Sequence, residues 1–118
     1  MSEKLRCMYA EDLKSKRVKM TVERVRKAPK QLYCNGQSTG AWDVIFKQKD
    51  KEGSTMYIQL PRPDSDGKRT AILRQFVMAT GGDPSDESIG KDLTLYPIES
   101  KKSVTGQAMR IAIPEHMA

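Results

Sequence analysis

The chain has little of the chemistry on which enzymes and metal sites depend. Its 118 residues include 1 histidine and 2 cysteines. The histidine, His116, stands near the C-terminal end, where chains are commonly disordered, and no Cys-x-x-Cys motif is present. A zinc site therefore lacks ligands, and we expect no metal and no cofactor. We interpret Cys7 and Cys34 as free thiols with packing or incidental roles.

Catalytic motifs are scarce as well. Acidic residues such as Asp83, Asp86 and Glu87 gather in one predicted turn, where helix capping and solvation explain them better than acid–base catalysis does. The pair Gly81 and Gly82 follows a predicted helix instead of a strand, so it does not form a phosphate-binding loop. We predict that the protein is not an enzyme.

Long apolar runs are also missing. The longest apolar stretch, residues 71–79, is interrupted by Arg74 and Gln75 and is far shorter than the roughly 20 residues that a transmembrane helix needs. The first residues, MSEKLRC, contain no apolar segment typical of a secretory signal. These observations predict a cytoplasmic protein that does not act at a membrane.

What the chain does have is an uneven distribution of positive charge. The net charge is +6, from 21 basic and 15 acidic residues. Residues 1–40 contain 10 of the basic and 4 of the acidic residues, so the whole excess lies in the first third. Such asymmetry indicates a surface that faces a polyanion, with nucleic acid the commonest candidate and an anionic membrane the second. A solvated basic strand without a ligand is the third alternative.

The apolar pattern predicts one domain, residues 1–118, with residues 1–8 and 114–118 as flexible ends. Residues 17–26 alternate as a strand, and the alternation changes phase at Glu23 and Arg24, which indicates a β-bulge in a long, bent strand. Four further strands are expected, at residues 42–48, 54–60, 92–97 and 108–113.

Between the third and fourth strands we predict a helix over residues 68–80, capped at its start by Asp64, Ser65 or Asp66 and ended by Gly81 and Gly82. Residues 27–40 form a long loop in which Asn35 and Gly36 can make a short hairpin tip.

Three strands, one helix and two strands is the order of the five-stranded OB-fold barrel. In this fold Leu73 and Phe76 of the helix would close the open end of the barrel. An SH3-like barrel or a small α+β sheet explains the position of the helix less well. The residues that we expect to fill the interior are Val18, Met20, Val22, Met56, Ile58, Leu93, Leu95 and Ile111.

Three segments carry a resemblance to a known group of proteins. They are AEDLKSK at residues 10–16, IGKDLTLYP at 89–97 and MRIAIP at 109–114. In these segments the chain resembles small phage-encoded OB-fold proteins that are related to single-stranded-DNA-binding proteins. The resemblance covers residues 9–114 and implies an OB fold and a role in DNA replication or recombination in the host cytoplasm. The cellular single-stranded-DNA-binding proteins usually end in an acidic tail that recruits partners. The last residues of this sequence are PEHMA.

On an OB barrel, the ligand crosses the outer face of strands two and three between two flanking loops. The first loop carries Lys27, Lys30 and Tyr33, and the second carries Lys101 and Lys102, so both sides of the predicted cleft are basic. The candidate nucleic-acid-binding residues are Arg24, Arg26, Lys27, Lys30, Tyr33, Trp42, Tyr57, Lys101, Lys102 and Arg110.

The aromatic members of this set have alternative roles. Tyr57 is expected to point outward, because its neighbours Met56 and Ile58 are expected to point into the barrel. Trp42, Val44 and Phe46 point to the same face of their strand, so Trp42 can equally be an anchor at the rim of the core. Tyr33 can equally fix its loop to the barrel. An exposed ring in this cleft would stack on a base, which stabilises binding by about 1–3 kcal/mol.

The function predicted from these observations is sequence-nonspecific binding of single-stranded nucleic acid, DNA in the first place, with RNA left open. The main alternative is a protein-interaction module whose basic face docks an acidic partner, for example a replication or host protein. Unpaired strand edges could also join two chains, so a homo-oligomer stays open.

Overall fold

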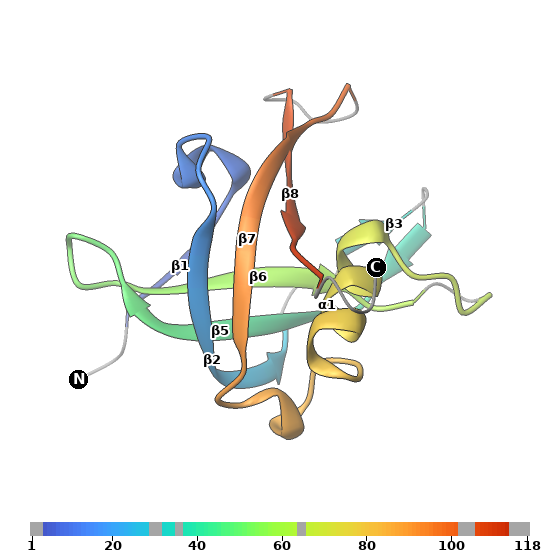
Figure 1. The fold of residues 1–118 in the computed structure, drawn as a ribbon. Helices are drawn as coiled ribbons and strands as arrows, with labels where there is room; N and C mark the ends of the chain where they lie inside the picture. The colour runs from blue at the N-terminus through green and yellow to red at the C-terminus, as the bar shows by residue number, and fades with distance from the viewer. Residues whose placement is uncertain (1–3, 29–31, 35–36, 64–65, 102–105, 114–118) are drawn as a thin grey trace.

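The computed structural model describes residues 4–28, 32–34, 37–63, 66–101 and 106–113, with the backbone alone for 32–34 and 37–39. Six strands form one curled sheet in the order β1-β6-β5-β2-β7-β8. Figure 1 shows β2 and β7 crossing in front of β5 and β6, so the sheet curls into a half-barrel. The strands are β1 (Leu5–Cys7), β2 (Val18–Lys27), β5 (Ala41–Lys49), β6 (Thr55–Pro61), β7 (Asp92–Glu99) and β8 (Gln107–Ile111).

The smaller elements join these strands. A separate two-stranded hairpin, β3 (Leu32–Cys34) with β4 (Gln37–Thr39), stands between β2 and β5, on either side of the predicted hairpin tip. One α-helix, α1 (Ala71–Thr80), follows β6. Short 3-10 turns, η1 (Ala10–Leu13) and η2 (Asp86–Ser88), precede β2 and β7. No helix in the described part of the chain is both long enough and apolar enough to span a membrane.

The strand count corrects the sequence-based prediction, which had five strands in a different order. The additional strand is β1, which pairs in parallel with β6 and lies where we expected a flexible end. The Lys4 carbonyl accepts a hydrogen bond from the Thr55 N–H, and the Met8 N–H donates to the Tyr57 carbonyl, each at 2.8 Å. Met8 is buried in the core.

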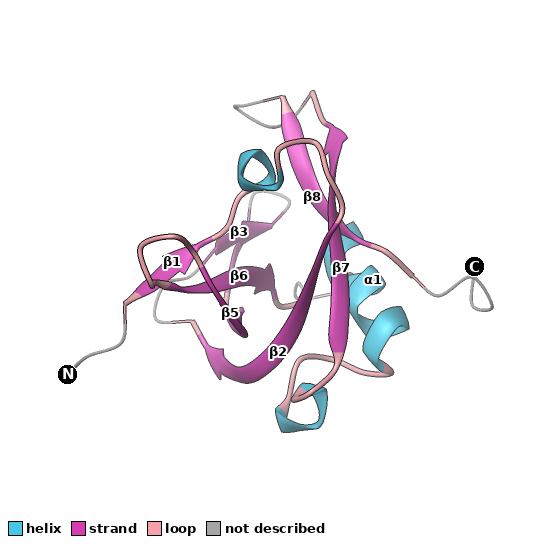
Figure 2. Ribbon diagram, turned by 60° about the vertical axis from the view of Figure 1, so that its left-hand side comes forward, coloured by secondary structure: helices cyan, strands magenta, loops and turns pink. Residues whose placement is uncertain are grey.

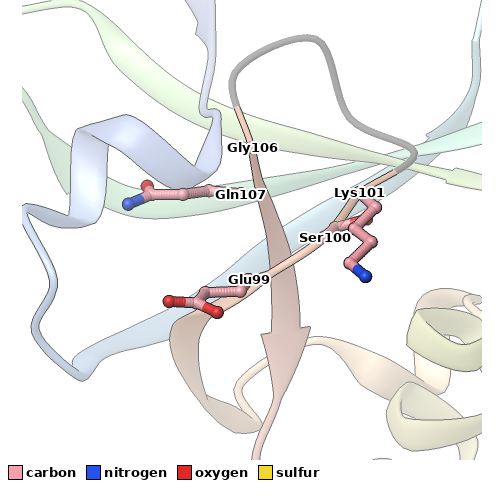
Figure 3. A pocket seen from close by; sticks show the side chains of 5 residues that line it. All are labelled: Glu99, Ser100, Lys101, Gly106 and Gln107. Atoms are coloured by element: carbon pink, nitrogen blue, oxygen red, sulfur yellow. The ribbon is translucent and has the colours of Figure 1, made fainter.

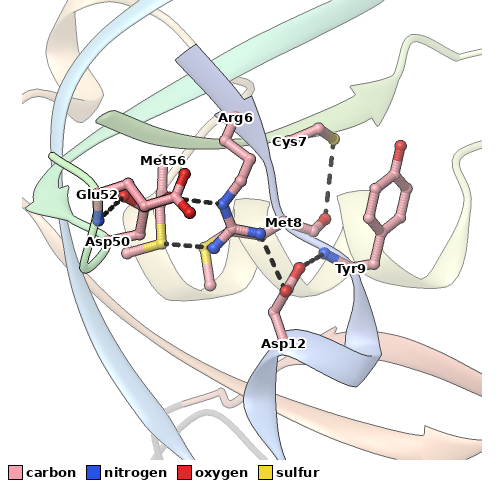
Figure 4. A network of polar contacts seen from close by, with 8 residues as sticks. All are labelled: Arg6, Cys7, Met8, Tyr9, Asp12, Asp50, Glu52 and Met56. Atoms are coloured by element: carbon pink, nitrogen blue, oxygen red, sulfur yellow. Dashed lines mark hydrogen bonds and ion pairs between the residues drawn. The ribbon is translucent and has the colours of Figure 1, made fainter. Parts of the chain in front are cut away.

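A polar network also holds β1 in place. The Arg6 guanidinium donates from Nε to Asp50 Oδ2 at 2.8 Å and from Nη1 to Asp12 Oδ1 at 2.9 Å (Figure 4). Asp12 in turn accepts from the Tyr9 N–H at 2.7 Å. One arginine therefore links β1 to η1 and to the turn between β5 and β6.

The bend of β2 is confirmed. Its N-terminal half pairs with β7 and its C-terminal half with β5, and the register with β5 shifts between Val22 and Arg24. A bulge adds one residue to one strand and increases the local twist, which lets a single strand belong to both halves of the curled sheet.

The core fills the inside of the curl. All eight residues that we expected to point inward are part of the core or pack against it. The fully or nearly fully buried members are Met8, Leu13, Met20, Val22, Val44, Phe46, Ile58, Leu60, Leu73, Phe76, Leu93, Leu95 and Ile111.

Helix α1 covers one end of this core. Leu73 and Phe76 are fully buried, and the helix lies beside β8 (Figure 2). Its N-cap is Thr70, whose hydroxyl accepts from the Leu73 N–H at 3.4 Å, so the helix begins later than predicted and Asp66 is not the cap. The other two predicted caps, residues 64 and 65, lie outside the described residues. Gly81, with φ of 96°, ends the helix as predicted.

Candidate nucleic-acid interface

The structure distributes the ten predicted site residues over three places instead of one cleft. Lys30 and Lys102 lie outside the described residues, as does the side chain of Tyr33. The other seven lie on the outer face of β2, β5 and β6, at the start of β5, or on the β7–β8 hairpin.

Arg24, Arg26 and Tyr57 share the outer face of the half-sheet formed by β2, β5 and β6. Arg24 pairs with Ile45, which pairs with Tyr57 on the next strand. Cross-strand partners point to the same side of a sheet, and the neighbours of these residues, Val44 among them, face the core. The outward direction predicted for Tyr57 therefore agrees with the pairing.

Arg26 is engaged by a buried carboxylate. Its Nε donates to Asp43 Oδ2 at 3.0 Å, and the Asp43 side chain is only 1% exposed. Among the described residues, the other carboxylate oxygen, Asp43 Oδ1, has no hydrogen-bond partner. Because this arginine already balances the charge of Asp43, it is a weak candidate for binding phosphate.

Tyr57 is half-buried among polar groups on the same face. Burial raises its pKa, and the neighbouring Cys7 and Asp43 raise it further. Burial likewise raises the pKa of the Cys7 thiol, which is free, as we predicted for this cysteine. A raised pKa keeps a thiol protonated near neutral pH, which makes it a poor nucleophile.

Trp42 lies at the rim of the core, at the start of β5. Its ring packs against the core and is partly exposed, so a position at the rim of the core and a contact with a ligand are compatible. Lys27 is its exposed cross-strand partner at the end of β2. The Arg62 guanidinium carbon lies 5.6 Å from the centroid of the Trp42 ring, within the range of a cation–π interaction.

Sequence reasoning missed Arg62 and the glycine that lets it reach Trp42. The Arg62 N–H donates to the Gly40 carbonyl at 2.9 Å, and a β-carbon on Gly40 would lie 3.2 Å from Arg62 Cδ. The Arg62 side chain therefore packs closely against Gly40, which has no side chain of its own. The sequence signal that could have pointed to Arg62 is the proline on each side of it, because two prolines restrict the backbone conformation around this arginine. We call Lys27, Trp42 and Arg62 the tryptophan cluster.

Lys101 lies in the turn between β7 and β8. It lines a surface hollow with Glu99, Ser100, Gly106 and Gln107 (Figure 3). Figure 3 shows that Glu99 and Gln107 point to one side of the hairpin, while Lys101 points to the other. The nearby carboxylate weakens the attraction that this hollow would exert on phosphate.

Arg110 lies on the outer face of β7 and β8, where it pairs with Tyr96. The guanidinium carbon of Arg17, the residue before β2, lies 5.0 Å from the centroid of the Tyr96 ring. We call Arg17, Tyr96 and Arg110 the tyrosine row.

The arginines of both sets differ from several other basic residues of the protein. Arg6, Lys19, Arg26 and Arg69 form ion pairs with aspartates. By contrast, within the described ranges no carboxylate lies at ion-pair distance from Arg17, Arg62 or Arg110. Within that part of the chain, the charge of these three arginines is not neutralised by an ion pair, which favours contact with an anion.

The described part of the chain contains no cluster of three histidine, cysteine, aspartate or glutamate side chains that could hold a metal ion. In the comparisons with known proteins, no family model, no curated protein and no solved structure matches the chain. The resemblance to phage-encoded OB-fold proteins therefore stays a prediction.

Proposed function

We propose that the protein binds single-stranded nucleic acid without sequence preference, and that the tryptophan cluster is a contact site. The strand would be DNA in the first place, in replication or recombination. The half-barrel would be a variant of the OB fold in which β1 occupies the edge of β6. Two features support that fold: β2 pairs with both β5 and β7, and the helix stands between β6 and β7.

The observation that carries the proposal is a partly exposed aromatic ring with one cation over it and a second basic residue paired with it on the next strand. Trp42 offers a ring surface at the rim of the core, Lys27 lies directly across from it, and Arg62 lies over it. A base can stack on an aromatic ring or on an arginine plane, while the adjacent charges attract phosphate. No part of this arrangement reads a base edge, so binding would be sequence-tolerant.

The test follows the emission of Trp42, the single tryptophan of the chain, during titration with an oligothymidylate of about 30 nucleotides. One informative variant is Gly40→Ala, because its new β-carbon would lie 3.2 Å from Arg62 Cδ and so crowds this side chain without removing a charge. Gly82→Ala is the matched control, since a β-carbon there meets nothing within 4 Å. Arg62→Ala removes the cation itself.

We expect the emission of the unmodified protein and of Gly82→Ala to change on binding, with equal affinities. Arg62→Ala should bind at least about fivefold more weakly, because it removes an arginine plane on which a base can stack, and stacking contributes about 1–3 kcal/mol. Gly40→Ala should lie between Arg62→Ala and the control, because it only crowds the arginine. An unchanged emission, or equal affinity in all four proteins, would contradict a contact at the tryptophan cluster.

A further inference from the structure

We propose that the tyrosine row is a second contact for single-stranded nucleic acid, on the half-sheet formed by β2, β7 and β8. This inference rests on the proposed function and extends it, because none of its residues belongs to the tryptophan cluster. A strand long enough to reach both sites would bind more tightly than a short one.

The row lies on the outer side of the sheet. Leu95 and Ile111 pair across β7 and β8 and are fully buried, so the next pair, Tyr96 and Arg110, points away from the core. Tyr96 and Arg110 are partly exposed, and Arg17 is exposed. The row thus presents one aromatic ring, with an arginine over it and another beside it.

Its arginines are held in place without being neutralised. Arg110 Nη1 donates to the Met109 carbonyl at 2.8 Å, and among the described residues no carboxylate pairs with its guanidinium. Arg17 is placed by its contact with the Tyr96 ring. Guanidinium groups of this kind bind phosphate oxygens bidentately.

The backbone before Arg17 is strained. Lys14 and Ser15 have φ of 51° and 61°, and they are the non-glycine residues with positive φ among the described residues. Two consecutive residues in this region are unfavourable and persist only where the surroundings require them. These two residues lie between η1 and β2, shortly before Arg17.

The ligand class follows from the combination of charge and ring. An acidic peptide would use the two arginines, but it gains nothing specific from the ring under Arg17. A nucleic-acid strand uses both, because its phosphates bind the guanidinium groups while a base stacks on the aromatic ring or on the arginine plane. We therefore favour nucleic acid over an acidic partner at this surface.

The test compares two oligothymidylates by fluorescence anisotropy. A strand of about 30 nucleotides spans about 100 Å even at the spacing of a duplex, more than twice the 40 Å longest extent of the protein. A strand of about four nucleotides spans only about 14 Å at that spacing. The variant is Arg17→Ala with Arg110→Ala, and its control, Lys51→Ala with Arg74→Ala, removes two exposed charges elsewhere.

We expect the Arg17/Arg110 variant to bind the long strand about tenfold more weakly than the control, with a salt dependence reduced by about 1.4 in slope, which corresponds to two phosphates. The change in Trp42 emission with the short strand should be the same in both proteins.

Four results can be told apart. The expected pattern supports both sites. Binding of the long strand that depends on the tyrosine row but leaves Trp42 emission unchanged supports the row and contradicts the tryptophan cluster. Equal binding of the long strand by variant and control overturns the second site. No binding by the unmodified protein overturns both.

Discussion

Replacing Arg26 with methionine distinguishes a structural role for this residue from a role in binding nucleic acid. Methionine keeps most of the side-chain length but removes the ion-pair partner of the buried Asp43 carboxylate, whose Oδ1 already lacks a partner among the described residues. A buried charge that loses its partner destabilises a fold strongly.

The expected loss can be placed on a scale. Breaking a fully buried ion pair costs about 3–5 kcal/mol. Because 46% of the Arg26 side chain is exposed while Asp43 is 1% exposed, we expect a smaller loss in the free energy of unfolding, about 2–3 kcal/mol. With a urea m value of about 2 kcal/mol per M, the unfolding midpoint falls by about 1–1.5 M.

A second substitution checks the reason for this loss. In Arg26→Met with Asp43→Leu, no charge is left buried, and replacing such a pair by apolar residues is often neutral or stabilising. The double variant should recover most of the lost stability and should bind oligothymidylate as the unmodified protein does. If Arg26→Met keeps the original unfolding midpoint but binds nucleic acid much more weakly, Arg26 is a ligand contact and the structural interpretation is wrong.

Two further predictions concern the helix and the network around Arg6. Thr70→Ala removes the hydroxyl that accepts from the Leu73 N–H and should lower the free energy of unfolding by about 1 kcal/mol in urea titration, whereas Thr70→Ser should not; equal losses in both would argue against the cap. The pKa of Asp50 is lowered, chiefly by the hydrogen bond from the Ser54 N–H and also by Arg6. The folded state therefore binds a proton at Asp50 less readily than the unfolded state does, and stability present above the ordinary aspartate pKa of about 3.9 is lost as the pH falls below it. Asp50→Asn should be less stable than the unmodified protein at pH 7 but should lose less stability between about pH 5 and pH 2, and identical pH profiles would refute this assignment.

Local sequence patterns predicted the parts of the fold that depend on local chemistry. The bend in β2 was visible because its bulge shifts the alternation at Glu23 and Arg24. The end of α1 was visible because Gly81 adopts a left-handed conformation that glycine favours. The strand β1 was not visible, because three residues carry no pattern. Their pairing depends on β6 and on an ion pair between Arg6 and Asp50, 44 residues apart.

The candidate site was harder to predict for the same reason. Composition indicated a basic surface, but not which basic residues are already neutralised. Arg26 is paired with Asp43, whereas Arg62 and Arg17 lie over aromatic rings that are 20 and 79 residues away in the chain. Such contacts between distant residues decide which charges stay available, and a single sequence does not show them.

The central claim is that the protein prefers single-stranded nucleic acid, and it is tested most directly by anisotropy titration of a labelled strand of about 30 nucleotides and of its duplex at two salt concentrations. The account predicts tighter binding to the single strand and an affinity that falls steeply as salt is raised. Absence of binding at low salt, or equal affinity for strand and duplex, would contradict it.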